Sequence, residues 1–208
     1  MAVRTALRGT STMAVCTALR GRVALIRIVN PPVNSLSHAV RLGISDGLDQ
    51  AEAANAAAVV ISGDAATFPA GADIAEFATG GERKAPMLPE IITRLSELRL
   101  HTIASLHGTA LGGGMELSLA CQYRLINDRG RVGLPEVHLG LIPGAGGTQL
   151  LPRLVGPEMA INLMASGRMI TAKEALLANL VDEVRVCMSV PIRHSQFVKR
   201  ACRGASAA

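Results

Sequence analysis

The sequence contains few aromatic residues: its 208 residues include no tryptophan, one tyrosine and three phenylalanines. Single-stranded nucleic acids are commonly bound by stacking bases on aromatic side chains, and this chain has few of them. The formal net charge of +5 does not favour a nucleic acid either, because the basic residues lie mostly at the two ends. Residues 1–45 hold six arginines and residues 185–208 hold five basic residues, without an acid, which leaves residues 46–184 at −6. We therefore expect no nucleic-acid partner.

Metal-binding and membrane-spanning patterns are also missing. The four cysteines include no Cys-x-x-Cys pair, and the five histidines include no pair at a metal-binding spacing. No apolar run reaches the ~18 residues that a membrane-spanning helix needs. The sequence therefore predicts a soluble protein without a metal site or a membrane segment. Unpaired cysteines are typical of a reducing compartment, so we expect a cytoplasmic location, with a mitochondrial or peroxisomal one as the alternative.

The N-terminus contains a near-repeat, because MAVRTALRG at 1–9 returns as MAVCTALRG at 13–21. An acid-free start with arginine and threonine is compatible with an organelle-targeting segment, and Met13 as the true translation start explains it equally well. We predict an N-terminal extension over 1–21, one domain over 22–184 and a divergent basic tail over 185–208. A chain of this length suits a single domain.

What the sequence does contain is an alternation of short apolar strands and amphipathic helices. This rhythm predicts an α/β fold, and the continuous apolar run at 56–63 is typical of a strand buried on both faces of a parallel sheet. The segment 133–156 is expected to be mostly loop. The predicted strands are 22–30, 56–63, 102–108 and 123–128; the predicted helices are 37–54, a short one within 69–78, 85–100, 114–122, 157–167 and 171–181.

Three consecutive glycines, Gly112, Gly113 and Gly114, lead directly into the helix predicted over 114–122. They lack the spacing of a dinucleotide-binding loop and the lysine of a P-loop. Two interpretations remain open. The glycines allow the turn to pack closely against a neighbouring strand, or they expose backbone amides at a helix N-terminus that suit a developing negative charge.

Two glutamates are candidates for acid–base chemistry. Glu116 lies in the first turn after the glycines, where it either complements the helix dipole or acts as a base. Glu136 is flanked by apolar residues that would raise its pKa if it is buried. A second turn, at Ala70 to Ala72, offers further backbone amides. No nucleophile elbow and no serine–histidine arrangement is present, so a hydrolase triad is not expected.

Five segments, in this order and at these spacings, together resemble the enoyl-CoA hydratase/isomerase (crotonase) family. They are NPPVNSLS, FPAGADIAEF, HGTALGGGMELSLAC, VGLPEVHLGLIPGAGGTQLLPRLVG and TAKEALLANLVDEV. The resemblance covers about residues 22–184 and is closest to the hydratase portion of multifunctional fatty-acid oxidation enzymes. It implies a crotonase-like spiral of repeated ββα units, assembled as a homo-oligomer, a trimer or hexamer.

The resemblance also implies a site. The oxyanion hole falls on the backbone N–H groups of Ala72 and Gly113, the catalytic carboxylates on Glu116 and Glu136, and water positioning on Gly144. Substrate-binding positions in the second turn are Ala70, Gly71, Asp73 and Ile74. The substrate is an acyl-CoA thioester, no separate cofactor is implied because coenzyme A is part of that substrate, and no metal is implied.

The implied reaction is the syn addition of water to a 2-enoyl-CoA, which gives a 3-hydroxyacyl-CoA in fatty-acid β-oxidation. Having both glutamates favours this hydratase over the Δ3,Δ2-enoyl-CoA isomerases, which use only the acid at the Glu136 position. The sequence departs from the family where Ala75 replaces a lysine that helps to hold CoA, and where the chain after about 185 loses helical periodicity. We expect little order from about residue 186 onward, and a truncated, catalytically weak acyl-CoA-binding protein is the alternative.

Overall fold

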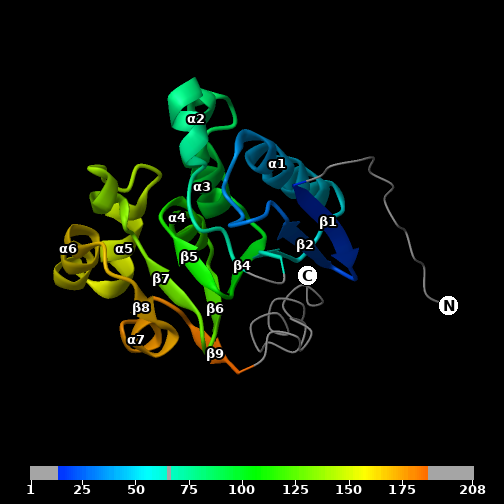
Figure 1. Ribbon diagram of the computed structural model, residues 1–208. Helices are drawn as coiled ribbons and strands as arrows, with labels where there is room; N and C mark the ends of the chain where they lie inside the picture. The colour runs from blue at the N-terminus through cyan, green and yellow to red at the C-terminus, as the bar shows by residue number, and fades with distance from the viewer. Residues whose placement is uncertain (1–13, 65–66, 187–208) are drawn as a thin grey trace.

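Two β-sheets organise the chain in the computed structural model, which describes residues 14–64 and 67–186 (Figure 1). The larger sheet has six strands in the order β1-β2-β3-β4-β6-β9, and the smaller has three in the order β5-β7-β8. In the larger sheet only β1 is antiparallel to its neighbour. Its strands are β1 Val15–Arg20, β2 Val23–Ile28, β3 Ala58–Ser62, β4 His101–Leu106, β6 Tyr123–Asn127 and β9 Glu183–Arg185.

Seven α-helices and two short 3-10 helices lie among the described residues. They include the helices predicted from apolar spacing, each within a few residues of its expected ends. The strands of the smaller sheet are β5 Thr109–Leu111, β7 Arg131–Gly133 and β8 Ile170–Thr171. The helices are α1 His38–Ala53, α2 Ile74–Thr79, η1 Gly81–Arg83, α3 Leu88–Glu97, α4 Gly113–Leu119, η2 Glu136–Leu139, α5 Gly147–Val155, α6 Pro157–Ser166 and α7 Ala172–Leu177.

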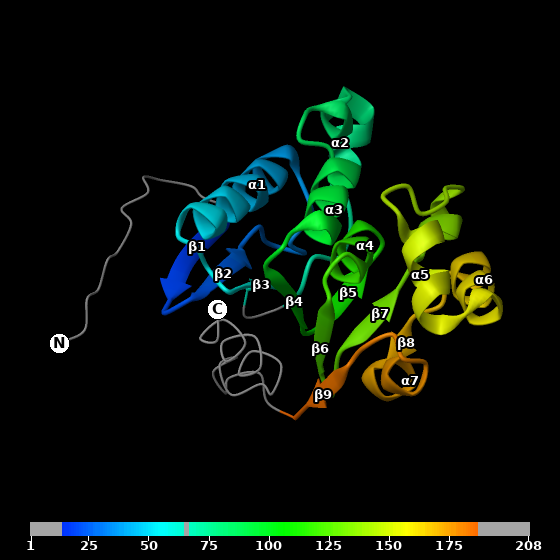
Figure 2. The same ribbon diagram turned by 180° about the vertical axis from the view of Figure 1, so that it is seen from behind.

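The two ends of the larger sheet carry different groups of helices. Helix α1 packs against β1 and β2, whereas α5, α6 and α7 gather around the smaller sheet at the opposite end. The same separation is seen from behind in Figure 2. Helices α3 and α4 lie between these groups, so α4 is enclosed by neighbours from both halves of the chain.

The strand predicted at 56–63 is β3, which lies between two parallel neighbours. The register pairs Ile26 of β2 with Ile61 of β3, and Ile61 with Ala104 of β4, and all three are fully buried. On the other face, Val60 and Ile103 are paired and equally buried. A strand with both faces covered must be apolar throughout, which explains the unbroken AVVI run.

The N-terminal extension predicted over 1–21 differs from the structure, because residues 15–20 form strand β1 and pair with β2. Two glycines of α1 allow this. A Cβ on Gly43 would lie 2.7 Å from Cβ of Val15, and a Cβ on Gly47 would lie 2.7 Å from Oγ1 of Thr17. The glycines that weaken the helical pattern of α1 are therefore the positions where strand and helix approach most closely.

The segment 133–156, predicted to be mostly loop, contains η2 and α5. Its glycines and Pro152 weaken the helical pattern in the sequence. Helix α5 nevertheless forms over Gly147–Val155, with Pro152 inside it and Leu151 buried in the core. Strands β5, β7, β8 and β9 were also missed, because two or three residues are too short to show an alternating pattern. The expectation of little order beyond residue 186 lies outside the described residues.

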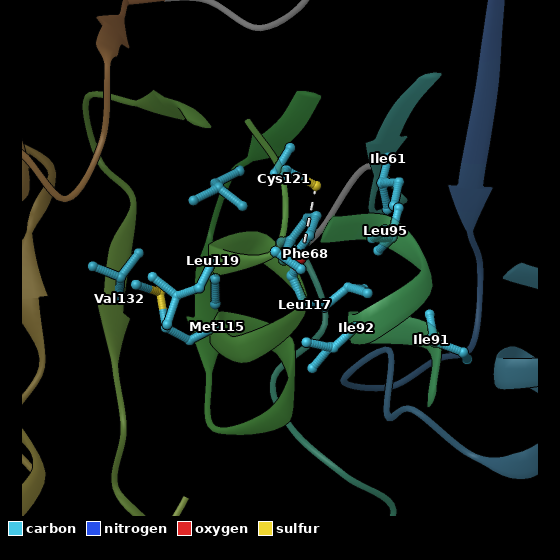
Figure 3. Close-up of a cluster of buried hydrophobic side chains, with 14 of the residues drawn as sticks. Ile61, Phe68, Ile91, Ile92, Leu95, Met115, Leu117, Leu119, Cys121 and Val132 are labelled. Carbon is cyan, nitrogen blue, oxygen red and sulfur yellow. Dashed lines mark hydrogen bonds between the residues drawn. The ribbon is translucent and has the colours of Figure 1, made fainter. Parts of the chain in front are cut away.

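Helix α4 is the most enclosed element of the core: all seven of its residues are buried. Met115, Leu117 and Leu119 project from it toward different neighbours, among them Ile92 of α3 and Val132 of β7 (Figure 3). Burial of each such side chain stabilises a fold by about 1.5–3 kcal/mol. Apolar packing on all sides thus fixes both ends of α4, including the glycine turn and Glu116.

Candidate active site

The turn before α2 and the turn before α4 meet in space. A Cβ on Gly113 would lie 3.5 Å from the Ala72 nitrogen, and one on Gly112 would lie 3.9 Å from Cα of Gly71. A Cβ on Gly114 would lie 1.8 Å from the carbonyl oxygen of Pro69, so no side chain fits there. Close packing against Pro69 therefore explains why residue 114 is a glycine. The contacts of Gly112 and Gly113 bring the two turns, with their backbone amides, together.

Both turns use backbone conformations that favour glycine. Gly112 has a φ of 50° and Gly71 a φ of 138°, values that residues with a Cβ rarely adopt. The Gly71 carbonyl accepts a hydrogen bond from the Leu36 amide at 2.9 Å, within a parallel bridge between Leu36 and Ala72. Helix α4 begins at Gly113, so its first N–H groups have no acceptor inside the helix. The meeting point therefore suits an oxygen atom that gains negative charge.

Glu116 is buried, with 2% of its surface exposed, and is held by backbone amides. Its Oε1 accepts hydrogen bonds from the Ala145 and Gly147 N–H groups, both at 2.8 Å. Burial raises the pKa of Glu116, and the two amide bonds counteract part of that rise. Neither Ala145 nor Gly147 was among the predicted site residues, although both lie in the glycine-rich stretch that contains Gly144.

Glu136 begins η2 and lies against the glycine turn. Its Oε1 is 3.2 Å from the position that a Cβ on Gly112 would occupy. Burial raises the pKa of Glu136 to about 7, and the negative charge of Glu116 adds to that rise. Its Oε2 is buried and has no hydrogen-bond partner within the described residues. A buried carboxylate oxygen without a partner is costly, which marks this atom as one available to a ligand.

The two glutamates that the sequence singled out are thus close enough for the charge of Glu116 to raise the pKa of Glu136. They lie 20 residues apart in the sequence: Glu136 lies against Gly112 of the glycine turn, and Glu116 lies in the first turn of α4, directly after that turn. Two carboxyl groups with raised pKa values beside a pair of glycine-rich turns can give and accept protons next to a polarised carbonyl group. This is an arrangement for acid–base catalysis.

The remaining predicted positions lie in the loop between η2 and α5 and in the turn before α2. Gly144 precedes the Glu116-binding amide of Ala145, and a Cβ there would meet only the Ile142 carbonyl, at 4.0 Å. Asp73 caps α2, because its Oδ1 accepts a hydrogen bond from the Ala75 amide at 3.1 Å.

Two more predicted positions flank Ala72 and Asp73. The Ala70 amide donates to the Val33 carbonyl at 3.2 Å, which anchors the start of the turn. Ile74 opens α2 and is 66% exposed beside the turn. Its apolar side chain is therefore available for contact with a ligand.

The part of the chain that the structure describes matches neither the pattern of a metal site nor that of a membrane-spanning helix. The described ranges contain no cluster of three or more histidine, cysteine, aspartate or glutamate side chains that could hold an ion. In the same part of the chain, no helix is long and apolar enough to cross a membrane. A surface hollow beside α3, lined by Glu52, Arg94 and Leu98 among others, contains none of the predicted site residues.

The sequence of this chain is similar to those of known enzymes. A family model described as enoyl-CoA hydratase/isomerase matches residues 19–207. The chain is 45% identical over 173 residues to the peroxisomal bifunctional enzyme of Danio rerio, covering 83% of this chain and 24% of that protein. It is 39% identical over 199 residues to the probable enoyl-CoA hydratase of Bacillus subtilis (strain 168), covering 90% of this chain and 77% of that protein.

Solved structures give the same picture. The enoyl-CoA hydratase from Bacillus anthracis superimposes with a TM-score of 0.83 at 35% identity, covering 93% of this chain and 77% of that one. The enoyl-CoA hydratase from Thermoplasma volcanium GSS1 gives 0.81 at 30% identity, covering 95% and 86%. These matches confirm the predicted crotonase-like α/β fold. The chain spans about a quarter of the length of the bifunctional enzymes that it matches.

Proposed function

The chain belongs to the enoyl-CoA hydratase/isomerase family, and from this premise we propose that it is an enoyl-CoA hydratase. It adds water syn across the double bond of a 2-enoyl-CoA and gives a 3-hydroxyacyl-CoA. The observation that carries the proposal is the pair of carboxyl groups, Glu116 and Glu136, with raised pKa values beside the turns of Ala72 and Gly113.

In the proposed mechanism the thioester oxygen lies between the Ala72 and Gly113 amides. Addition at C3 pushes negative charge onto that oxygen, and the two N–H groups stabilise it. One such donor is typically worth about 10²–10³-fold in rate. The substrate-binding turn continues through Asp73, which caps α2, and Ile74, which is the first residue of α2. The Ala72 amide therefore lies directly before the helix.

The two glutamates divide the handling of protons. Both amide bonds to Glu116 go to Oε1, which leaves Oε2 to accept a hydrogen bond from the attacking water, placed with help from the Gly144 amide. The water oxygen bonds to C3 and its proton passes to Glu116. Glu136, with a pKa of about 7, delivers a proton to C2. Exchange with solvent then restores both carboxyl groups.

The direct test follows the loss of conjugated enoyl absorbance when the protein is mixed with crotonyl-CoA. We expect turnover by the unaltered chain and a loss of about 10²–10⁴-fold in kcat for Glu136→Gln. Glu158→Gln is the matched control, because Glu158 is an exposed glutamate in the first turn of α6. Tight binding of the thioester without turnover by the unaltered chain would contradict the hydratase and favour an acyl-CoA-binding role.

A second candidate is a Δ3,Δ2-enoyl-CoA isomerase activity at the same site. The observation that favours it is the pKa of Glu136, because a group that titrates near neutral pH can both remove and return a proton. A 3-enoyl-CoA substrate separates the two reactions. If Glu136 alone carries isomerisation, Glu116→Gln loses hydration and keeps the conversion of the 3-enoyl to the 2-enoyl thioester.

The biological setting is part of the proposal. Relatives named as glyoxysomal and peroxisomal multifunctional proteins of fatty-acid β-oxidation support an acyl-CoA substrate and an organelle location. We also propose a homo-oligomer, a trimer or hexamer, without a separate cofactor. Light scattering on the purified full chain tests the proposed homo-oligomer, and a monomer at micromolar concentration would contradict it. Fluorescence imaging of the chain against peroxisomal, mitochondrial and cytoplasmic markers tests the location.

A further inference from the structure

A buried arginine lies behind the turn that carries the Ala72 amide. Arg41 of α1 is 3% exposed, and all five of its N–H donors are used. Only one acceptor is a carboxylate; the others are backbone carbonyls. The bonds are Nε to Pro86 O at 2.9 Å, Nη1 to Leu36 O at 2.9 Å and to Glu76 Oε2 at 2.8 Å, and Nη2 to Gly81 O at 2.8 Å and Lys84 O at 3.4 Å.

Two of these partners flank the Ala72 turn. Leu36 forms the parallel bridge with Ala72, and its amide donates to the Gly71 carbonyl at 2.9 Å. Glu76 lies in α2, four residues after Ala72, and its Oε1 also accepts from the His38 amide at 2.5 Å. One guanidinium nitrogen, Nη1, therefore contacts the segments on both sides of the turn.

The rest of α2 offers little other restraint. None of its six residues is buried, so apolar packing does not hold it against the core. Burial alone would raise the pKa of Glu76, but the bonds from the His38 amide and from Arg41 outweigh it and lower the pKa. The charged form of Glu76 is thus the stable one, and the ion pair persists at neutral pH.

We propose that Arg41 is a positioning residue that holds the Ala72 amide in place through the Leu36–Ala72 bridge and through Glu76. The inference rests on the proposed function, because it takes the Ala72 amide as a donor to the thioester oxygen. Lysine can replace arginine only in part, because its three donors lie on one atom and cannot span acceptors on both sides of the turn. A shift of about 1 Å at a reacting group can cost on the order of 10²-fold in rate.

The test compares Arg41→Met, Arg41→Lys and Glu76→Gln with a control, Arg94→Met. Arg94 also joins two segments and contacts Asp49 and Glu52 at 2.6 and 2.5 Å, but its partners lie on α1 and not in the turn. We expect Arg41→Met to lower kcat on crotonyl-CoA by about 10–100-fold with KM within about threefold. Arg41→Lys and Glu76→Gln should lose less, and Arg94→Met should keep its kcat.

A spectroscopic measurement separates positioning from general stability. A conjugated thioester such as cinnamoyl-CoA absorbs at longer wavelength when hydrogen bonds polarise its carbonyl group, so its bound spectrum reports the amide pair without turnover. The shift should shrink in Arg41→Met and persist in Arg94→Met. An unchanged shift and kcat in a folded Arg41→Met would overturn the proposal, as would equal losses in both variants that follow their melting temperatures.

Failure of the hydratase proposal remains distinguishable. If the unaltered chain shifts the spectrum of cinnamoyl-CoA without hydrating crotonyl-CoA, the hydratase is wrong and the spectral series still tests Arg41. If the unaltered chain produces no shift, the Ala72 amide is not a donor and the inference about Arg41 is overturned with it. Should Arg41→Met not fold, Arg41→Lys and Glu76→Gln must show the reduced shift for the proposal to stand.

Discussion

Helices α4 and α2 both begin at a turn of the candidate site, yet they are held in opposite ways. All seven residues of α4 are buried, whereas none of the six residues of α2 is. Apolar packing fixes α4, and the ion pair between buried Arg41 and partly buried Glu76, with backbone hydrogen bonds, fixes the start of α2. The site thus joins a rigid half, which carries Glu116, to a half whose position depends on polar contacts.

This difference determines what substitutions should do. A change in α4 should affect folding unless it preserves volume and hydrogen bonding, because close-packed interiors respond to the loss of a single methylene. A change on the exposed face of α2 should leave folding almost intact and alter only contacts with the ligand. The predictions that follow use this contrast, in order of decreasing effect.

The largest effect is expected from Glu116→Gln, which changes charge inside α4 and keeps shape. The glutamine oxygen can still accept the Ala145 and Gly147 amide bonds, so the melting temperature should stay close to that of the unaltered chain. The side chain can no longer take a proton from water, so kcat for hydration should fall by about 10²–10⁴-fold. A variant that retains hydration would remove Glu116 from the mechanism.

Met115→Ala tests the packing of the same helix without touching the carboxyl groups. Met115 is 1% exposed and packs among the buried side chains around α4 (Figure 3). Truncating it leaves a cavity, and such changes typically cost about 2–5 kcal/mol of unfolding free energy. Chemical denaturation measures the loss. A cost below about 0.5 kcal/mol would show that α4 is not the rigid half of the site.

The titration of Glu136 should control how both the activity and the stability of the chain depend on pH. As the proposed proton donor it must be protonated, so kcat/KM should decrease as the pH rises through its pKa of about 7. Because the folded-state pKa is raised, the folded chain binds more protons than the unfolded chain between the two pKa values. The contribution of Glu136 to the free energy of unfolding is therefore full below its pKa in the unfolded chain and is lost as the pH rises through its folded-state pKa of about 7. Glu136→Gln should remove both trends; a profile that rises steadily through pH 8 would contradict the assignment.

The sequence predicted those parts of the site that depend on local pattern. The glycine run before an apolar helix located the start of α4, and both glutamates proved to be neighbours in space. Of the two interpretations of the glycines, packing applies to Gly114, whose missing side chain leaves room for the Pro69 carbonyl. The same stretch places Gly113 next to Ala72. One run of glycines therefore allows close packing at Gly114 and brings the Gly113 turn to the Ala72 turn.

What the sequence did not reveal depends on contacts between distant segments. Arg41 counted only as one of six arginines in an acid-free N-terminal region, because its partner Glu76 is 35 residues away. The amides that hold Glu116 come from 29 and 31 residues further along the chain. Glycines in a sequence can indicate a turn with accessible backbone donors, but they do not identify the distant side chain that those donors bind.

The smallest effect is expected from Ile74→Ser on α2. Ile74 is 66% exposed, and exposed substitutions usually change the unfolding free energy by less than about 0.5 kcal/mol. If the side chain contacts the acyl-CoA beside the Ala72 turn, losing it should raise KM by about 10-fold or less and leave kcat unchanged, because the contact is present equally in the ground and transition states. Steady-state kinetics with crotonyl-CoA measure both values. A loss of kcat at constant KM would instead mean that Ile74 helps to place the amide, and the exposed half of the site would then depend on more than the Arg41 contacts.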